Sequence, residues 1–208
     1  MSILSLIFPE KCAFCGKALK TIGVCDTCKT ELPWWGGCEE LADGLKITAP
    51  LKYEGKARFA LLNFKFHGRK NHARTFADLM EVCIQNHYGA DSFDAVTFVP
   101  LHWLRRLKRG YNQTELLANA LSRKFGVQVL KTLTKPKRAK ANSGLNSAQR
   151  AGNVTDAFRI KCSSGVSGKR ILLIDDVCTT GATLRETAKI LIQAGASDVI
   201  CAAVCRTV

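Results

Sequence analysis

The chain has 208 residues, of which 47% are hydrophobic and 23% are charged. These proportions are those of a soluble globular protein with one main core and a small appendage, and they leave no room for a second full-sized domain. The 31 basic residues exceed the 17 acidic ones, which gives a net charge of +14. Such an excess fits a polyanionic partner, an anionic small molecule or simple solubility, so net charge alone identifies no partner.

Residues 1–9 are apolar but too few to span a bilayer, and no basic segment precedes them. Glu10 and Lys11 follow where a secretory signal would have small residues for cleavage. We therefore expect a cytoplasmic protein without membrane insertion. Most of the ten cysteines are then expected to be reduced core residues, apart from four in a spacing that suits a metal.

The four N-terminal cysteines have the spacing C-x2-C-x9-C-x2-C, which is typical of a structural zinc site. Four thiolates complete the tetrahedral coordination of Zn²⁺, so a catalytic metal with an open position is disfavoured. Cys38 is an alternative ligand, but it has no second cysteine with which to form a C-x2-C pair. Trp34 and Trp35 are expected to pack the zinc module against the body, with stacking on a nucleic-acid base as the alternative. The predicted ligands are Cys12, Cys15, Cys25 and Cys28.

From residue 36 to residue 125, the pattern of apolar and polar residues predicts two strands and three helices around basic turns. An irregular stretch at residues 36–45 precedes a strand at 47–53, a helix at 56–64, a basic turn at 65–69, a helix at 72–85, a strand at 93–99 and a helix at 113–125. His67 and His72 are interpreted as ordinary surface histidines because no acidic or cysteine companions accompany them.

Residues 101–112 form a predicted loop at the carboxyl end of a strand, where ligands of open parallel sheets bind. Its guanidinium groups suit pyrophosphate oxygens. Arg106 and Lys108 also fit a solvated charge run, whereas Arg109 is held beside Gly110 and Tyr111.

The second half predicts strands at residues 127–133, 157–161 and 198–205, with a turn at 162–169. Between the first two strands, residues 134–151 are basic and rich in Ser, Asn and Gly, which indicates a mobile loop that closes over a ligand. This order of strands and helices predicts an α/β sheet.

The most informative run is ILLIDDVCTTGAT at residues 171–183. It predicts a buried parallel strand that ends in two carboxylates, then a loop whose amides face an anion, and a helix from 184 to 194. A P-loop ATPase is excluded because the chain lacks G-x-x-x-x-G-K-[ST]. A structural turn without ligand is a minority interpretation beside the cluster of threonines. The run resembles the 5-phosphoribosyl-1-pyrophosphate (PRPP) signature of type I phosphoribosyltransferases.

Basic residues gather in three segments, which would form a positive groove if they lie near one phosphate site. The candidate nucleic-acid-binding residues are Lys65, Arg69, Lys70, Arg105, Arg106, Lys137 and Arg138.

Beyond the PRPP run, the chain resembles the ComF family, a zinc-ribbon-bearing branch of the phosphoribosyltransferases. The resemblance rests on the N-terminal knuckles, YEG at 53–55, KFHGR at 65–69, RGYNQ at 109–113, Leu145, the RxxNV and AF pairs at 150–158, and DDVxTTGxT at 175–183. Where family members commonly have Arg, Thr and Gln ahead of the Leu145 position, this chain has Lys135, Ala139 and Asn142.

The resemblance implies a type I phosphoribosyltransferase-like parallel sheet flanked by helices. It divides the chain into a zinc-ribbon module at residues 1–45 and a phosphoribosyltransferase-like domain at 46–208, with a hood at 134–158. It also implies PRPP, or a related phosphosugar, bound with Mg²⁺. The candidate residues for that ligand are Asp175, Asp176, Thr179, Thr180, Gly181, Ala182, Thr183, Arg109, Asn112 and Gln113.

Members of this family are linked to natural transformation and to the use of DNA as a nutrient. The resemblance therefore implies a protein that binds single-stranded DNA and works with other competence proteins, such as a ComF-operon helicase. The alternative is an active phosphoribosyltransferase that joins ribose 5-phosphate to an unidentified acceptor and releases pyrophosphate. No residue is an obvious general base, so the catalytic residues stay unassigned.

Overall fold

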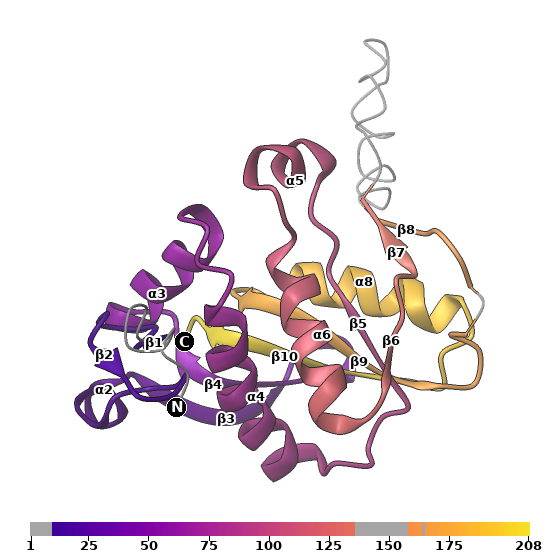
Figure 1. The fold of residues 1–208 in the computed structure, drawn as a ribbon. Coiled ribbons are helices and arrows are strands. Elements are labelled where there is room, and N and C mark those ends of the chain that lie inside the picture. The colour runs from indigo at the N-terminus through magenta and orange to yellow at the C-terminus, as the bar shows by residue number, and fades with distance from the viewer. Residues whose placement is uncertain (1–9, 136–157, 164) are drawn as a thin grey trace, which may run out of the picture.

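A computed structural model describes residues 10–135, 158–163 and 165–208 of the chain. Its centre is a six-stranded sheet with the strand order β3-β4-β10-β9-β5-β6 (Figure 1). The strands are β3 Trp34–Glu40, β4 Lys46–Lys52, β10 Asp198–Arg206, β9 Arg170–Cys178, β5 Ala95–Phe98 and β6 Gln128–Val129. β9 and β10 are flanked by parallel partners, and most of their residues are buried, as their apolar runs predict.

The prediction that residues 36–45 are irregular is wrong, because the first of these residues belong to the strand β3. It pairs antiparallel with β4 at the edge of the sheet, so the sheet is mixed and its other five strands are parallel. Partly buried and exposed residues alternate along β3, because an edge strand has one covered face. The two glycines of WWGGCEE conceal this alternation in the sequence.

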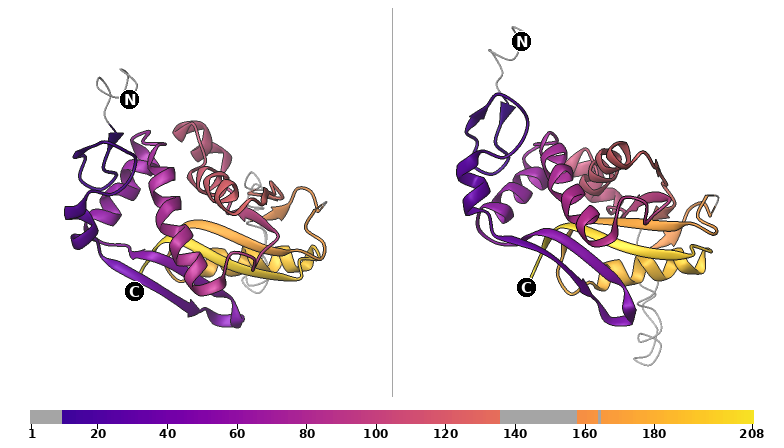
Figure 2. Two further views of the ribbon diagram at one scale, coloured as in Figure 1. Left: turned by 60° about the horizontal axis from the view of Figure 1, so that its bottom comes forward. Right: turned by 90° about the horizontal axis from the view of Figure 1, so that it is seen from below.

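Helices cover both faces of the sheet (Figure 2). α3 Gly55–Phe66, α4 His72–Tyr88 and α6 Gln113–Phe125 lie on one face, and α8 Ala182–Gln193 lies on the other. Each interface has its own hydrophobic cluster. Leu172 and Ile174 of β9 belong to the first cluster, whereas Ile171 and Leu173 belong to the second.

The prediction that residues 101–112 form a loop is wrong, because Trp103–Arg109 form the helix α5. The His102 side chain accepts a hydrogen bond from Leu104 N at 3.4 Å, and Gly110 ends the helix in the left-handed conformation. None of its residues is buried, and the helix stands away from the sheet (Figure 1). Trp103, Leu104 and Leu107 have helical spacing but are exposed, so this helix has no face against the core. Four of its seven residues are basic, which favoured the interpretation as a loop.

The N-terminal module contains β1 Glu10–Lys11, β2 Ala18–Leu19 and α2 Asp26–Glu31. Phe14 packs edge-on against Phe76 of α4, with ring centroids 5.9 Å apart. Trp34 Nε1 donates to Lys29 O at 2.8 Å, so this tryptophan contacts the module as predicted. Trp35 does not, since it packs against the cluster under α8.

Two further predictions need correction. The single strand predicted at 127–133 is two short strands, β6 and β7 Leu133–Thr134, and β7 pairs antiparallel with β8 Arg159–Ile160. His72 is buried and its Nδ1 lies 3.4 Å from Ala60 O, because it starts α4 beneath α3. The apolar residues 1–9 and most of the predicted hood lie outside the described residues. None of the helices in the described ranges is both long and apolar enough to cross a membrane.

Candidate functional site

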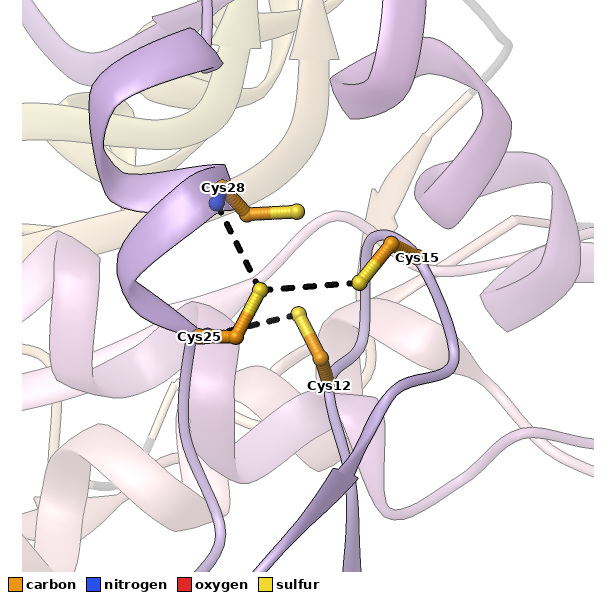
Figure 3. Close-up of side chains that lie close together, drawn as sticks. All are labelled: Cys12, Cys15, Cys25 and Cys28. Carbon is orange, nitrogen blue, oxygen red and sulfur yellow. Dashed lines mark hydrogen bonds between the residues drawn. The ribbon is translucent and has the colours of Figure 1, made fainter.

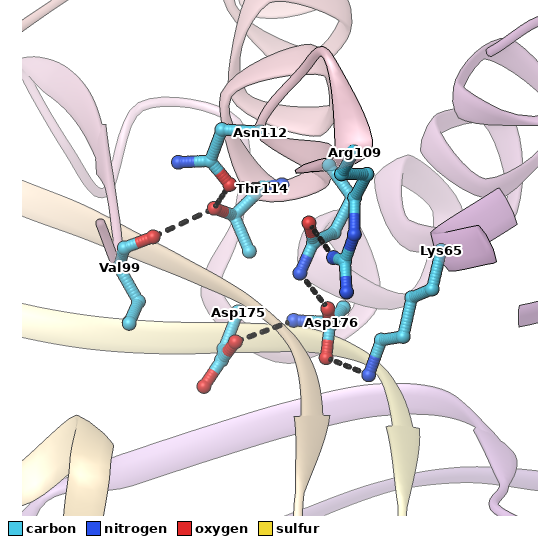
Figure 4. Close-up of polar contacts among 8 residues, drawn as sticks. Lys65, Val99, Arg109, Asn112, Thr114, Asp175 and Asp176 are labelled. Atoms are coloured by element: carbon cyan, nitrogen blue, oxygen red, sulfur yellow. Dashed lines mark hydrogen bonds and ion pairs between the residues drawn. The ribbon is translucent and has the colours of Figure 1, made fainter. Parts of the chain in front are cut away.

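The two consecutive aspartates lie near the carboxyl end of β9 and belong to opposite faces of the sheet. Asp176 faces α3 and α6, as do Leu172 and Ile174, whereas Asp175 follows the side of Ile171 and Leu173 beneath α8. The main-chain amide of Asp176 donates to Asp175 Oδ1 at 2.8 Å (Figure 4). The pair therefore presents carboxylate oxygens on both sides of one strand end.

Two side chains from different helices contact Asp176, and a third side chain supports one of them. The Asp176 side chain is 7% exposed, and Lys65 Nζ lies 2.6 Å from Oδ1 (Figure 4). Gln113 Nε2 donates to Oδ2 at 2.5 Å. Arg109 in turn donates to Gln113 Oε1. Burying a carboxylate is costly unless hydrogen bonds and an opposite charge compensate it, and the contacts with Gln113 and Lys65 supply both. Lys65 and Gln113, which are far apart in sequence, therefore meet at one acid.

Asp175 has a different environment. Burial raises its pKa to about 8, and the charge of Asp176 adds to the effect, against the opposing influence of the Asp176 amide, Lys65 and Lys135. Near neutral pH this carboxyl group is therefore largely protonated, unless a bound cation or ligand stabilises its ionised form.

The loop after β9 has the geometry of a small anion cradle. A cavity of about 30 Å³ lies in front of it, lined by Asp175 and by residues 177–184. Within the described part of the chain, the main-chain amides of Thr179 and Thr180 have no acceptor. Gly181 has φ = +73°, which allows the loop to turn into α8, and Leu41 packs against it. Thr179, Thr180, Ala182 and Thr183 are exposed, so an anion can reach the cradle.

Arg206, at the end of β10, supports this loop from behind. Its guanidinium group donates to the carbonyls of Cys178, at 3.1 Å, and of Thr179, and its Nε lies 2.5 Å from Glu39 Oε1. The loop carbonyls are therefore held on the sheet side.

Asn112 has a local structural contact. It is the N-cap of α6, where Oδ1 accepts from Thr114 N at 3.2 Å, and the Thr114 hydroxyl donates to Val99 O at 2.7 Å (Figure 4). This cap fixes the start of α6 and with it the position of Gln113.

A second cavity, of about 550 Å³, lies between the end of α3 and α5, and we call it the basic groove. Its lining residues are Lys65, Phe66, Gly68, Arg105, Lys108 and Arg109. Arg109 stacks over the Phe66 ring at 4.9 Å, and burial lowers its pKa from the ordinary value. Lys65 lines the groove and also pairs with Asp176, so the groove adjoins the acidic pair.

The other predicted basic residues are distributed differently. Arg69 lines another cavity beside the cysteine module, and Lys70 lies over the Tyr111 ring at 5.2 Å. Arg106 pairs with Glu115 at 3.4 Å, which agrees with a solvated surface position. Lys137 and Arg138 lie outside the described residues.

The sequence did not single out Arg206, Leu41 or the aromatic ring of Phe66 for this site. Arg206 is a lone arginine at the end of the last strand, and only the strand order places it beside the loop after β9. Phe66 sits inside the KFHGR segment, so its interleaving with basic residues was a readable signal.

The four N-terminal cysteines converge as their spacing predicts. Their Sγ atoms all lie within 4.8 Å of one another, which fits ligands around a single metal ion (Figure 3). Cys25 N donates to Cys12 Sγ at 3.5 Å and Cys28 N to Cys25 Sγ at 3.4 Å. Four sulfur donors at the corners of one small space suit Zn²⁺, so the cluster could bind zinc as a structural ion.

Comparison with known proteins assigns the class first. The phosphoribosyl transferase domain family matches residues 113–207, which include α6, the paired aspartates and the cradle. The enzyme described as the allosteric regulatory enzyme of purine biosynthesis has 21% identity, a TM-score of 0.48 and coverage of 68% of this chain and 29% of its own. An adenine phosphoribosyltransferase of Thermoanaerobacter pseudethanolicus has 18% identity, a TM-score of 0.39 and coverage of 61% and 64%. The protein has a phosphoribosyltransferase-type α/β fold with an N-terminal four-cysteine module.

Full-length relatives define the family. Competence protein F of Haemophilus influenzae is 30% identical over 90% of this chain and 86% of its own length. The DNA utilization protein YhgH of Escherichia coli is 30% identical over 88% and 78%, and the competence protein ComFC of Streptococcus pneumoniae is 33% identical over 90% and 84%. The chain belongs to the ComF family.

Proposed function

We propose that the protein acts in the cytoplasm in DNA uptake or DNA utilisation, where it binds single-stranded DNA and carries a PRPP site. The observation that carries the proposal is the position of Lys65, which lines the basic groove and contacts Asp176 beside the phosphate cradle. A polyanion groove and a phosphosugar site then share one wall. The names of the relatives, which refer to competence and to DNA utilisation, support the biological setting.

In the PRPP site, the amides of Thr179 and Thr180 would hold the 5-phosphate, since a helix N-terminus follows them. Asp175 and Asp176 would hold the ribose hydroxyls and Mg²⁺, because carboxylate oxygens are the ligands this ion prefers. Mg²⁺ would neutralise charge on the pyrophosphate. Arg109 and Gln113 lie beside Asp176, so after rearrangement of their present contacts they would face the same pyrophosphate.

A thermal-shift measurement tests the PRPP site. PRPP with Mg²⁺ should raise the melting temperature of the wild-type chain, because it binds only the folded state. The D175N/D176N variant should give no shift. The matched control is Asp91→Asn, an exposed aspartate near the opposite end of the strands, which should keep the full shift. Equal shifts in all three proteins would contradict the assignment.

Fluorescence anisotropy tests DNA binding. Affinity for a labelled oligothymidylate should fall steeply with salt, with a log–log slope of about −0.7 per phosphate contact. The variant R105Q/K108Q should weaken binding and flatten the slope, whereas R123Q/K189Q, with exposed charges outside the groove, should change little. Salt-insensitive or undetectable binding by the wild-type chain would reject this function.

An active phosphoribosyltransferase is the second candidate. It is favoured by the juxtaposition of two carboxylates, a cradle and an open cavity of about 550 Å³ that has room for an acceptor. The test is pyrophosphate release from PRPP over a panel of bases and nucleic acids. Turnover that D175N/D176N retains in full would exclude this site as its source.

A further inference from the structure

The cavity of about 640 Å³ between the cysteine module and helices α3 and α4 is not used by the function proposed above. We call it the module cleft. One wall is the first cysteine knuckle and the other is the outer side of α3 with the turn that follows it. Its lining residues are Glu10, Lys11, Cys12, Ala13, Phe14, Cys15, Gly16, Phe59, Asn63, His67, Arg69, Asn71 and His72.

The polar side chains in this cleft are available for a ligand. Among the described residues, the side chains of Asn63, His67, Arg69 and Asn71 have no hydrogen-bond or ion-pair partner. Arg69 is a cation that no carboxylate of the described chain neutralises. Glu10 also lines the cleft, but Lys11 adjoins it and offsets its charge.

An exposed aromatic ring completes the set. Phe59 is 60% exposed in the cleft, and Phe66, which lines the basic groove, is 64% exposed. The two rings are seven residues apart, so they lie on the same side of α3, about two turns or 10.5 Å apart along its axis. A ring for stacking, amide groups for base edges and an arginine for phosphate are what single-stranded nucleic acid requires.

The two cavities are neighbours. Residues 63–69 separate them, with Asn63, His67 and Arg69 lining the module cleft and Lys65, Phe66 and Gly68 lining the basic groove. A strand that lies in the groove has only to cross this segment to reach the cleft. An apolar peptide fits the cleft less well, because most of the side chains from α3 and the following turn are polar or cationic.

We propose that the module cleft binds one nucleotide unit of a single-stranded DNA, with the base on Phe59 and the phosphate at Arg69. The inference rests on the DNA binding proposed above, and it adds a second contact region in which the cysteine module forms part of the binding surface.

The experiment uses the zinc-loaded full chain and a labelled oligothymidylate in fluorescence anisotropy. Phe59→Leu removes the ring from an exposed position, and Phe59→Trp restores a stacking surface. Phe59→Leu should weaken binding by roughly five- to 150-fold and Phe59→Trp should keep it. Arg69→Gln should weaken binding and reduce the salt slope by about 0.7. Val82→Ala and Arg123→Gln, at exposed positions outside both cavities, are the matched controls.

Wild-type affinity in both Phe59→Leu and Arg69→Gln would overturn the inference while leaving salt-dependent DNA binding, and so the proposed function, in place. Absence of DNA binding by the wild-type chain would overturn both. Free thymidine monophosphate is added as a competitor. If it displaces the oligonucleotide from the cleft at the oligonucleotide's own concentration range, the cleft is a mononucleotide site and the proposal for a strand is wrong.

Discussion

At the scale of residues, the site depends on how one strand separates two neighbouring acids. Lys65 and Gln113 contact the two carboxylate oxygens of Asp176. Asp175 has no such partner among the described side chains, and its main compensation is the Asp176 amide. The two carboxyl groups therefore have different surroundings, although they are adjacent in the sequence.

The raised pKa of Asp175 predicts a loss of folding stability that depends on pH. An aspartate ionises near pH 4 in the unfolded chain but only near pH 8 here. Between these values the folded state holds more protons, so this group lowers the free energy of unfolding by up to about 1.4 kcal/mol per pH unit as pH rises. Asp175→Asn should therefore be increasingly more stable than wild type from pH 5 to pH 8 in urea titrations.

The control for this prediction is Asp91→Asn, whose difference from wild type should stay flat over the same range. A constant difference between Asp175→Asn and wild type from pH 5 to pH 8 would contradict the raised pKa.

Two separate constraints favour glycine at position 181, and their costs in unfolding free energy can be measured separately. Its φ of +73° disfavours any other residue, and an added Cβ would lie 2.6 Å from Leu41 Cδ1. Gly126 has φ = +68° with open space around it. Gly126→Ala should cost about 1–2 kcal/mol of unfolding free energy, and Gly181→Ala about 1 kcal/mol more. In a Leu41→Ala background the two costs should become equal; a persistent gap would mean that Leu41 is not the obstacle.

At the scale of elements, the anion cradle belongs to three segments. β9 carries the aspartates near its end, α8 begins after Gly181, and β10 supplies Arg206 beneath the loop. Parallel strands that end at one edge bring these parts together. α5 adds a basic helix at the same edge, although its residues have no buried face.

The contacts of Arg206 predict that this residue holds the cradle in position. Arg206→Met removes the donors to Cys178 O and Thr179 O and should cost about 2 kcal/mol of stability. It should also reduce the PRPP-dependent rise in melting temperature, because the loop loses its support. Arg170→Met is the control, since Arg170 pairs with Asp94 at the opposite end of β9. A full PRPP shift in Arg206→Met would indicate that the arginine only stabilises the fold.

At the scale of the whole molecule, the cysteine module and the body share one core. Phe76 of α4 contacts Phe14 of the module and Phe64 of α3, with ring centroids 5.9 and 5.5 Å apart. The thiolates and the sheet are therefore expected to unfold together, even though the module has little core of its own.

Phe76 tests this coupling. Phe76→Ala should lower the free energy of unfolding by about 3–5 kcal/mol and should also accelerate zinc transfer to a chelator. Phe93→Ala removes a buried ring that packs on Phe125 instead. It should destabilise the chain to a similar degree with little effect on zinc transfer. Equal zinc kinetics in both variants would show that the module is independent of the body.

The α/β class was predictable from the sequence, as were the convergence of the four cysteines and the carboxylates before a threonine-rich loop. These features depend on local order, since a buried strand, a knuckle and a helix start each have short-range signals. β3 and the buried position of His72 were predicted wrongly because edge pairing and the packing of α4 under α3 are not encoded by the period of apolar residues. α5 was predicted as a loop because its four basic residues outweighed the helical spacing of its apolar ones.

Only the tertiary structure decided which distant residues meet. The strand order places Arg206 behind the cradle, and the position of α3 and α6 on the same face of the sheet brings Lys65 and Gln113 to Asp176. Chain spacing carries no information about these contacts, because they depend on which elements become neighbours in the sheet. The sequence by itself determined the chemical groups available to this protein, and folding determined which of them share one site.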